Sequence, residues 1–363
     1  MVLKRIAVLT SGGDAPGMNS AVRAVVRMAT GLGLEVFGIE RGYQGLLEAD
    51  FHRLQIRDIG GILGRGGTIL QSARTEEFKT ETGRRKALHN LNKTGIDGLI
   101  IIGGNGTHQG AFGLSKMGFP IVTIPSTIDN DLCFTDITLG VDTALNTVLE
   151  AIDKIRDTAS SHQRAFLIET MGRNSGYLAL MSGIAGGAEV ILIPEAPMTP
   201  EQVLEAIQAQ YALGKAHSII VVAEGYKPGT HAVYDYLRER EKECGFTVRM
   251  TILGHIQRGG RPTAAERVLA TRLGVAAVQQ LTAGNYGVMV GLIGNKIQIT
   301  DLSQVVACHK GVDLEFYELA KTLEFGQSTT SPLMKTAPPT LSEWSRLGGD
   351  GTIRVEDRVP EEF

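Results

Sequence analysis

Short apolar runs rich in β-branched residues recur along the chain and predict buried strands. They lie at residues 6–10, 99–102, 121–124, 166–168, 190–193, 219–222 and 288–293. A run that is apolar at every position is typical of a strand covered on both faces, as in a parallel sheet. Between these runs the pattern predicts helices, at residues 17–33, 83–91, 143–159, 199–213, 231–243 and 264–281. The alternation of strand and helix predicts an α/β fold with mainly parallel sheets.

Length, charge and cysteine content narrow the class of protein. A chain of 363 residues with 43% hydrophobic residues is long enough for two or three compact units. The net charge of -3 predicts neither a nucleic-acid partner nor an anionic membrane surface. No apolar stretch is long enough for a signal or membrane segment, so we expect a soluble, cytoplasmic protein. The three cysteines lie far apart, which predicts neither disulfides nor a thiolate metal site.

Glycine is unusually common and gathers in the loops that follow the predicted strands. The chain has 45 glycines, about 12% of its residues against a usual share near 7%. Glycine-rich or polar segments follow three of the strands, at residues 11–14, 103–107 and 125–131. Because ligands of α/β sheets bind beyond the carboxyl ends of the strands, these segments are candidate binding loops.

The segment GGNGTHQG at residues 103–110 joins a predicted strand to a predicted helix. Glycines let backbone amides approach phosphate oxygens, and a helix N-terminus adds partial positive charge. The segment therefore favours a phosphate cradle, although a tight turn without a ligand remains the alternative. It matches neither the Walker P-loop nor the dinucleotide glycine spacing.

The segment TIDND at residues 127–131 places two carboxylates beside the glycine loop. In phosphoryl transfer, one carboxylate can take the hydroxyl proton while another helps to hold Mg²⁺. A solvated turn is the alternative interpretation. Cations that could neutralise phosphates occur at loop-like positions, each of which alone would be a surface residue: Arg74, Arg164, Arg173, Arg249, His255 and Arg258.

Together these segments resemble the 6-phosphofructokinase family from about residue 4 to residue 325. The resemblance rests on long signatures that occur in family order. They are LTSGGDAPGMN (9–19), RGGTILQSAR (65–74), IGGNGT (102–107), PSTIDND (125–131), SSHQR (160–164), MGRNSGYLAL (171–180) and LGHIQRGG (253–260). The family implies ATP:fructose-6-phosphate 1-phosphotransferase activity in glycolysis, with two Rossmann-like lobes and the active site in the cleft between them.

The resemblance also implies a role for individual residues. Asp129 matches the base that accepts the proton of the sugar hydroxyl, Thr127 positions the substrate, and Arg74 and Arg173 steady the phosphoryl group. The sugar-phosphate site is implied to contain Thr127, Asp129, Met171, Gly172, Arg173, Glu224, His255 and Arg258, with Arg164 and Arg249 coming from a neighbouring subunit. The nucleotide side is implied to contain Gly13, Tyr43, Arg74, Thr75, Gly104, Asn105, Gly106, Thr107 and Gly110.

Two positions bear on the phosphoryl donor. ATP-using members have glycine where this chain has Gly106, whereas pyrophosphate users have aspartate there. Pyrophosphate users typically have lysine where this chain has Ser126. ATP is therefore favoured, and pyrophosphate-dependent activity is the alternative. Asn105 departs from the family, which usually has aspartate there near Mg²⁺, so we expect Asp131 and the donor phosphates to carry most of the metal binding.

Regulation and assembly are further expectations from the resemblance. Effector positions are matched by Arg23, Arg27, Arg156, Glu189 and Lys215, but an arginine expected near residue 56 is Ile56, with Arg57 adjacent. A homo-oligomer, either a dimer or a tetramer, is implied. The predicted larger lobe comprises residues 1–140 and 256–305, the smaller lobe 141–255 and 306–326, and a tail 327–363. A sugar-phosphate or nucleotide sensor without catalysis is the alternative from another class of protein, and Asp129 argues against it.

Overall fold

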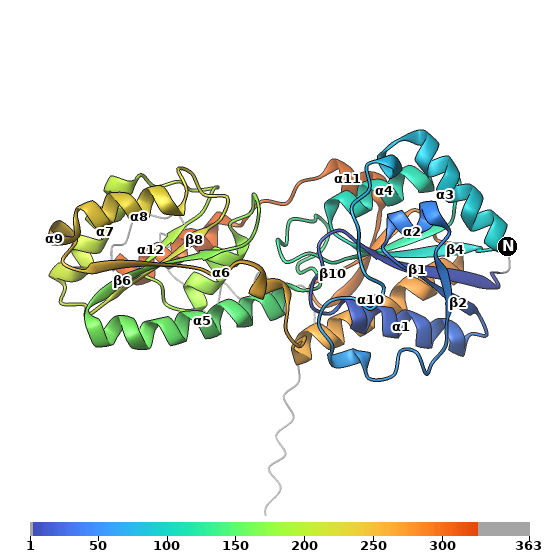
Figure 1. Cartoon of the computed structure of the whole chain (residues 1–363), viewed down its shortest axis with the longest axis horizontal. Coiled ribbons are helices and arrows are strands. Elements are labelled where there is room, and N and C mark those ends of the chain that lie inside the picture. Colours follow the sequence, from blue (N-terminus) through green and yellow to red (C-terminus); the bar gives the residue numbers. More distant parts are fainter. Residues whose placement is uncertain (1–2, 326–363) are drawn as a thin grey trace, which may run out of the picture. The chain divides into compact units, whose positions relative to one another are not determined.

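The computed structural model describes residues 3–325, which contain two β-sheets (Figure 1). The first sheet has seven strands, in the order β11 (Lys296–Asp301), β10 (Val288–Ile293), β5 (Ile121–Pro125), β4 (Gly98–Gly103), β1 (Arg5–Ser11), β2 (Glu35–Ile39) and β3 (Phe51–Leu54). The second has four, in the order β7 (Val190–Leu192), β8 (Ser218–Ala223), β6 (Arg164–Thr170) and β9 (Thr247–Ile252). Among the described strands, the pairs β2–β3 and β10–β11 are antiparallel and the other pairs are parallel. The predicted fold class is therefore confirmed.

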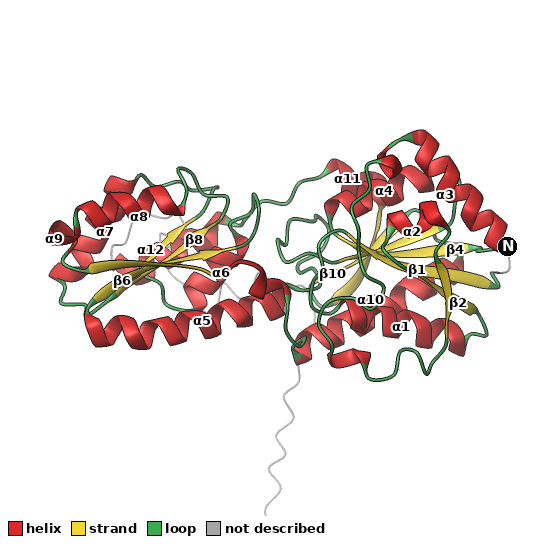
Figure 2. Cartoon of the chain, viewed as in Figure 1, coloured by secondary structure: helices red, strands yellow, loops and turns green. Residues whose placement is uncertain are grey.

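Helices cover both faces of the seven-stranded sheet (Figure 2). Ile6 and Val8 of β1 pack in one core with α1 (Met18–Gly31) and α10 (Ala264–Ala283). Ala7 and Leu9 belong to the opposite core. Its helices are α2 (Tyr43–Glu48), α3 (Glu81–Thr94), α4 (Asn105–Ser115) and α11 (Leu302–Ala307). Because successive side chains of a strand point to opposite faces, both sets are apolar, which explains the uninterrupted runs in the sequence.

The four-stranded sheet is also flanked by helices (Figure 2). α5 (Val141–His162) and α6 (Tyr177–Ala185) pack together, and α7 (Pro200–Ala212) packs against α8 (Thr230–Glu239). The prediction of one helix over residues 231–243 is wrong. Arg240 leaves the helical conformation with φ -116°, so that α8 ends at Glu239 and α9 (Glu241–Cys244) follows.

The connections include three short 3₁₀ helices, η1 (Ile62–Gly64), η2 (Glu77–Lys79) and η3 (Gly254–Arg258). The described residues up to Leu314 form one compact unit, and those from Glu315 onward belong to a second. α12 (Leu314–Phe325) is the last described element. None of the described helices combines the length and the apolar run needed to cross a bilayer. The predicted tail at 327–363 lies outside the described residues, and the lobe boundaries stay a prediction.

Candidate active site

Three loops begin at the same edge of the seven-stranded sheet. They are residues 12–17, Gly104 and residues 126–140, which follow the parallel strands β1, β4 and β5. These strands are direct neighbours, and Gly103 at the end of β4 is aligned with both Ser11 and Pro125. The topology thus brings the glycine-rich and acidic segments of the sequence together.

The glycine loop between β4 and α4 is tightly packed at its start and open further on. A Cβ on Gly103 would lie 2.4 Å from the backbone oxygen of Ser11, so a larger residue does not fit there. A Cβ on Gly106 would meet nothing within 4 Å, and Gly106 is exposed. Packing therefore does not require glycine at position 106. The first turn of α4 has free backbone amides and partial positive charge, which fits the predicted phosphate cradle.

Tyr43, predicted on the nucleotide side, supports the first turns of α4 from within the protein. Its side chain is buried and its ring is stacked on Phe78, with 3.9 Å between the ring centroids. The hydroxyl donates to the backbone oxygen of Thr107. A Cβ on Gly110 would lie 2.7 Å from the ring, so glycine at this position lets Tyr43 and α4 approach.

The segment before Arg74 is held by two side chains from the β1–α1 region. Asn19 donates to the backbone oxygens of Arg65 and Gly66, both at 3.1 Å, and accepts from the amide of Ile69. Thr10 donates to the backbone oxygen of Gln71 at 2.9 Å. The two predicted residues that follow, Arg74 and Thr75, are exposed and half-buried respectively. This network fixes the base of the segment and leaves the Arg74 side chain accessible.

Asp129 is a buried carboxylate without a hydrogen-bond donor among the described residues. It is 7% exposed. Burial raises the pKa of Asp129 above its ordinary value, and the negative charge of Asp131 adds to the rise. The positive charges of Arg258 and Arg173 act in the opposite direction. Asp129 is therefore a carboxylate of increased basicity facing cations, an arrangement suited to proton acceptance.

The loop that carries Asp129 is fixed by internal hydrogen bonds. Asn130 has a positive φ of 50°, and its side chain donates to the backbone oxygen of Asp136 and accepts from the amide of Thr138. The Thr138 hydroxyl donates to the backbone oxygen of Thr127, while the Thr127 hydroxyl accepts from the amide of Asp129. These bonds span the turn from both sides, so the backbone at position 129 has little freedom.

Asn105 and Asp131 are direct partners. The Asn105 amide nitrogen donates to one carboxylate oxygen of Asp131 at 2.6 Å. Asp131 is half-buried, and its other carboxylate oxygen has no donor among the described residues. The departure from the family at position 105 thus gives Asp131 a neutral hydrogen-bond donor where an aspartate would give it a second negative charge.

The four-stranded sheet contributes the turn that follows β6. The amides of Gly172 and Arg173 both donate to one oxygen of Glu224, at 3.1 and 2.6 Å. Arg173 has a φ of 54°, a left-handed conformation uncommon for a residue other than glycine. Glu224 therefore holds Gly172 and Arg173 in place through the backbone, a positioning role that the sequence did not reveal.

The 3₁₀ helix η3 supplies His255 and Arg258. Arg258 donates to the backbone oxygen of Asp14 at 3.2 Å. A Cβ on Gly13 would lie 2.5 Å from the guanidinium, so glycine at this position leaves room for the arginine. Gln257, which is fully buried, accepts from the amide of Met171 at 3.1 Å. η3 thus contacts the loop after β1 and the turn after β6, while His255 stays exposed.

Two predicted substrate residues do not join this cluster. Arg164 begins β6, a strand of seven residues, and so lies about 20 Å from the turn at its other end. Arg249 lies in the neighbouring strand β9, opposite Phe166, and its guanidinium contacts Val248 and Glu241. Within one chain both arginines are therefore remote from Met171 and Arg173.

Three of the five predicted effector residues lie close together. Arg156 donates to the backbone oxygens of Gly186 and Gly187, and Lys215 forms an ion pair with Glu189 at 3.2 Å. Arg23 and Arg27 are on α1, beneath the other sheet, where Arg23 is half-buried and Arg27 exposed. The structure thus separates the predicted effector residues into two groups.

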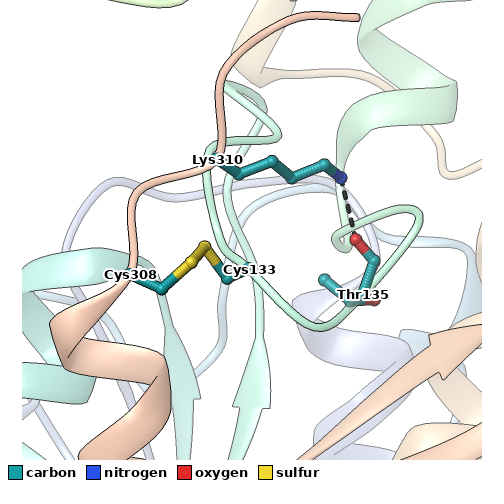
Figure 3. Close-up of a disulfide and its surroundings, with 4 residues drawn as sticks. All are labelled: Cys133, Thr135, Cys308 and Lys310. Carbon is teal, nitrogen blue, oxygen red and sulfur yellow. Dashed lines mark hydrogen bonds between the residues drawn. A yellow bond between two sulfur atoms is a disulfide. The ribbon is translucent and has the colours of Figure 1, made fainter.

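The prediction that the chain has no disulfide is wrong. Cys133 and Cys308 are bonded, with 6.0 Å between their Cα atoms, although 175 positions separate them in the sequence (Figure 3). The prediction fails because it used spacing along the chain, whereas the antiparallel edge strand β11 and α11 return residue 308 to the loop after β5. Cys244 is the free, buried cysteine.

Glu266 is a buried carboxylate that sequence reasoning missed. It is 1% exposed and accepts from the amide of Gly140 at 2.8 Å and from the amide and hydroxyl of Thr143. Gly140 and Thr143 belong to the N-terminus of α5, which has no side-chain cap of its own. Thr263 before α10 donates in return to Asp142. Glu266 therefore caps α5, and these bonds join the starts of α5 and α10 at the end of the loop that contains Asp129.

Known proteins with a similar sequence belong to one family. The phosphofructokinase family profile matches residues 5–281. An ATP-dependent 6-phosphofructokinase of Halalkalibacterium halodurans is 53% identical over 321 residues, which cover 88% of this chain and 99% of the relative. Proteins with the same name from Clostridioides difficile and, as 6-phosphofructokinase 1, from Thermus thermophilus are each 52% identical over 88% of this chain.

Solved structures agree with this assignment. The phosphofructokinase of Saccharomyces cerevisiae is 38% identical with a TM-score of 0.78, covering 88% of this chain. The chain spans only about half of that protein, 47% of its length. A pyrophosphate-dependent phosphofructokinase of Marinobacter aquaeolei has a TM-score of 0.76 over 86% of both chains at 23% identity, a similarity of fold alone.

Proposed function

Because the chain belongs to the phosphofructokinase family, we propose that it is an ATP:D-fructose-6-phosphate 1-phosphotransferase of glycolysis. The products are fructose 1,6-bisphosphate and ADP. The observation that carries the proposal is the Asp129 carboxylate, which is buried without a donor among the described residues and is influenced by the positive charges of Arg173 and Arg258. A cytoplasmic location belongs to the same proposal, since ATP and sugar phosphates are cytoplasmic metabolites.

The chemistry assigned to the site is a single displacement at phosphorus. Asp129 accepts the proton of the sugar 1-hydroxyl as the new bond from this oxygen to the γ-phosphorus forms and the bond from phosphorus to the ADP oxygen breaks. The raised pKa of Asp129 strengthens it as a base. Thr127 orients the hydroxyl, and Arg74 and Arg173 balance the charge of the phosphoryl group in transfer. His255 and Arg258 donate hydrogen bonds to the phosphate of the sugar.

Magnesium binding is proposed at Asp131. Carboxylate oxygens are the hard ligands that Mg²⁺ prefers, and Asp131 has one oxygen that accepts no hydrogen bond among the described residues. The donor set therefore fits the ion. A bound Mg²⁺ supplies charge neutralisation to the phosphates of the donor. The amide of Asn105 orients the Asp131 carboxylate toward the glycine loop from which Asn105 comes.

ATP is the proposed donor because the space at Gly106 is free. With no atom within 4 Å of a Cβ there, the missing side chain leaves room for a ligand rather than for protein. Ser126 is 1% exposed and its hydroxyl faces the backbone oxygen of Leu139, so it offers no cation to a small donor. Pyrophosphate is the second candidate donor.

A second copy of the chain is proposed to complete the sugar-phosphate site. Arg164 and Arg249 are remote from the other substrate residues of the same chain, and the family's pattern assigns them to a neighbouring subunit. The separation of Arg23 and Arg27 from Arg156, Glu189 and Lys215 fits an effector site divided between subunits in the same way. The assembly proposed is a homo-oligomer of two or four chains with allosteric control.

A coupled assay with ATP or pyrophosphate as donor tests the proposal. We expect fructose 1,6-bisphosphate with ATP. Gly106→Asp should lower kcat/KM for ATP at least about tenfold by placing a carboxylate against the donor phosphates, with Gly106→Ala as the matched control for bulk. Product with pyrophosphate but not ATP would establish the second candidate. Sugar-phosphate binding without product from either donor would instead indicate a sensor.

A further inference from the structure

The disulfide lies directly beside the proposed catalytic loop. Cys133 follows Asp131 by two positions, and Cys308 follows α11 (Figure 3). The bond therefore joins the loop after β5 to the segment that follows α11, although the two cysteines are 175 positions apart in the sequence. Its position, rather than its presence, makes it relevant to function.

Polar contacts of the same segment reinforce the covalent one. The ammonium group of Lys310 donates to the backbone oxygen of Thr135 at 2.8 Å (Figure 3) and to that of Asp136 at 2.9 Å. The backbone amide of Lys310 donates to the backbone oxygen of Asp131 at 3.4 Å. The segment 308–310 is thus attached to residues 131–136 by the disulfide and by the hydrogen bonds of Lys310. These bonds add to those that Asn130 makes within the turn. Loss of the disulfide removes the strongest of these attachments.

The bond is accessible to a reductant from one side. Cys133 is 6% exposed, whereas Cys308 is exposed. Thiol–disulfide exchange requires a thiolate to reach one sulfur, and Cys308 is the more exposed of the two cysteines. In a reducing compartment, which we propose for this chain, disulfides are rare and are as a rule transient and regulatory or catalytic.

We propose that Cys133 and Cys308 form a reversible redox site for dithiol reductants, and that its oxidation state sets the order of the loop at residues 126–138. A dithiol donates two electrons and two protons; its first thiolate attacks the Cys308 sulfur, Cys133 leaves as thiolate and is protonated, and the second thiol of the reductant resolves the mixed disulfide. The products are two cysteine thiols and the disulfide of the reductant. The oxidised form holds Asp129 and Asp131 in the productive arrangement.

The test compares full-length protein equilibrated with oxidised glutathione or with reduced dithiothreitol. Mass spectrometry of peptides from non-reduced digests should link Cys133 to Cys308 in the oxidised form only. Amide hydrogen exchange of residues 126–138 should be about tenfold faster after reduction. With ATP as donor, kcat should fall about three- to tenfold on reduction, because small displacements of catalytic groups are costly. The KM for fructose 6-phosphate should change less than kcat, because its proposed phosphate ligands, His255 and Arg258, lie outside this loop.

Variants separate the disulfide from other thiol effects. Cys308→Ser, at an exposed position that tolerates the change, should behave as the reduced protein under both conditions. Cys244→Ala removes the free thiol and should leave the response intact. Equal exchange rates in the two states, or thiols that stay unlinked in oxidised glutathione, would overturn the proposal. The exchange and peptide measurements need no turnover, so failure of the proposed activity would not be confused with failure of the redox site.

Discussion

Two buried carboxylates, Asp129 in the loop after β5 and Glu266 at the start of α10, show how different surroundings give the same functional group different roles. They are 7% and 1% exposed. Burial is the largest cause of a raised pKa in both, and it raises the pKa of Glu266 to about 7. The difference lies in hydrogen bonding. Glu266 accepts from two amides and a hydroxyl, whereas Asp129 accepts from no described donor.

The difference separates a structural carboxylate from a functional one. A buried ionised group without donors is costly, since its lost hydration is not replaced. Glu266 offsets this cost with the N-terminus of α5, as the helix itself has no other side-chain cap. Nothing among the described residues does this for Asp129 except the more distant charges of Arg258 and Arg173. A substrate hydroxyl would supply the missing donor.

The largest effect is expected from Asp129→Asn. Loss of the base should lower kcat by about 10²- to 10⁴-fold with little change in the KM for fructose 6-phosphate, because the base acts in the transition state. The variant should be at least as stable as the wild type, since it removes a buried charge without donors. Steady-state kinetics and urea unfolding measure both. A large rise in KM at unchanged kcat would contradict the role.

The reciprocal change, Glu266→Gln, should damage stability instead. The amide still accepts from Gly140, but the NH₂ group replaces the oxygen that accepts from the amide of Thr143. One buried donor without a partner costs about 1–3 kcal/mol in the free energy of unfolding. We expect kcat within about threefold of the wild type, since Glu266 touches no substrate group. A collapse of kcat at unchanged stability would abolish the distinction between the two carboxylates.

Sequence alone predicts the fold class and the position of Asp129, but not Glu266. Strands buried on both faces are recognisable from runs such as residues 99–102, and the edge strand β7 lies within the predicted run 190–193. The missed strands β2, β3, β9 and β11 contain polar and exposed or partly buried residues, so that no continuous apolar run marks them. The three binding loops follow from parallel topology, so Asp129 was found beside the glycine loop. Its burial and lack of donors depend on packing that no local pattern records.

Glu266 and the disulfide escaped prediction because their partners are remote in the chain. Thr263 and Glu266 have the spacing of a local capping box, and Thr263 does accept from the amide of Glu266. The carboxylate, however, caps a helix whose first residues lie 126 positions away. Cys133 and Cys308 are separated by 175 positions. Such pairs become visible only when the sheet order is known, since spacing rules describe neighbours within one element.

The pH dependence of stability sharpens the comparison further. The pKa of Glu266 is about 7 in the folded protein against an ordinary value of 4.5. A carboxyl group with a raised folded pKa stabilises the folded state fully below its unfolded pKa, and this contribution is lost as the pH rises through 7. From about pH 5.5 to about pH 7.5, the wild type should lose about 2 kcal/mol relative to Glu266→Gln. Urea unfolding of both proteins at the two pH values measures this, and parallel pH profiles would contradict the assignment.

Asp131 stands between the two extremes, because it has one donor, the amide of Asn105. Asn105→Asp replaces that donor with a like charge within hydrogen-bond distance. Two adjacent carboxylates repel each other unless a cation lies between them, so the variant should bind Mg²⁺ more tightly. We expect the free Mg²⁺ concentration for half-maximal turnover to fall about three- to tenfold. The measurement is turnover against free Mg²⁺ at a fixed concentration of ATP complexed with Mg²⁺.

Gln109→Glu is the matched control for Asn105→Asp, because it adds the same charge at an exposed position of the same helix, α4. General attraction of cations by the added charge would lower the Mg²⁺ requirement of both variants equally, and would be screened by salt. A specific effect at Asp131 would appear in Asn105→Asp alone and persist at high ionic strength. If neither variant changes the Mg²⁺ dependence, the amide at position 105 does not limit metal binding, and Asp131 with its one donor belongs with Glu266 rather than with Asp129.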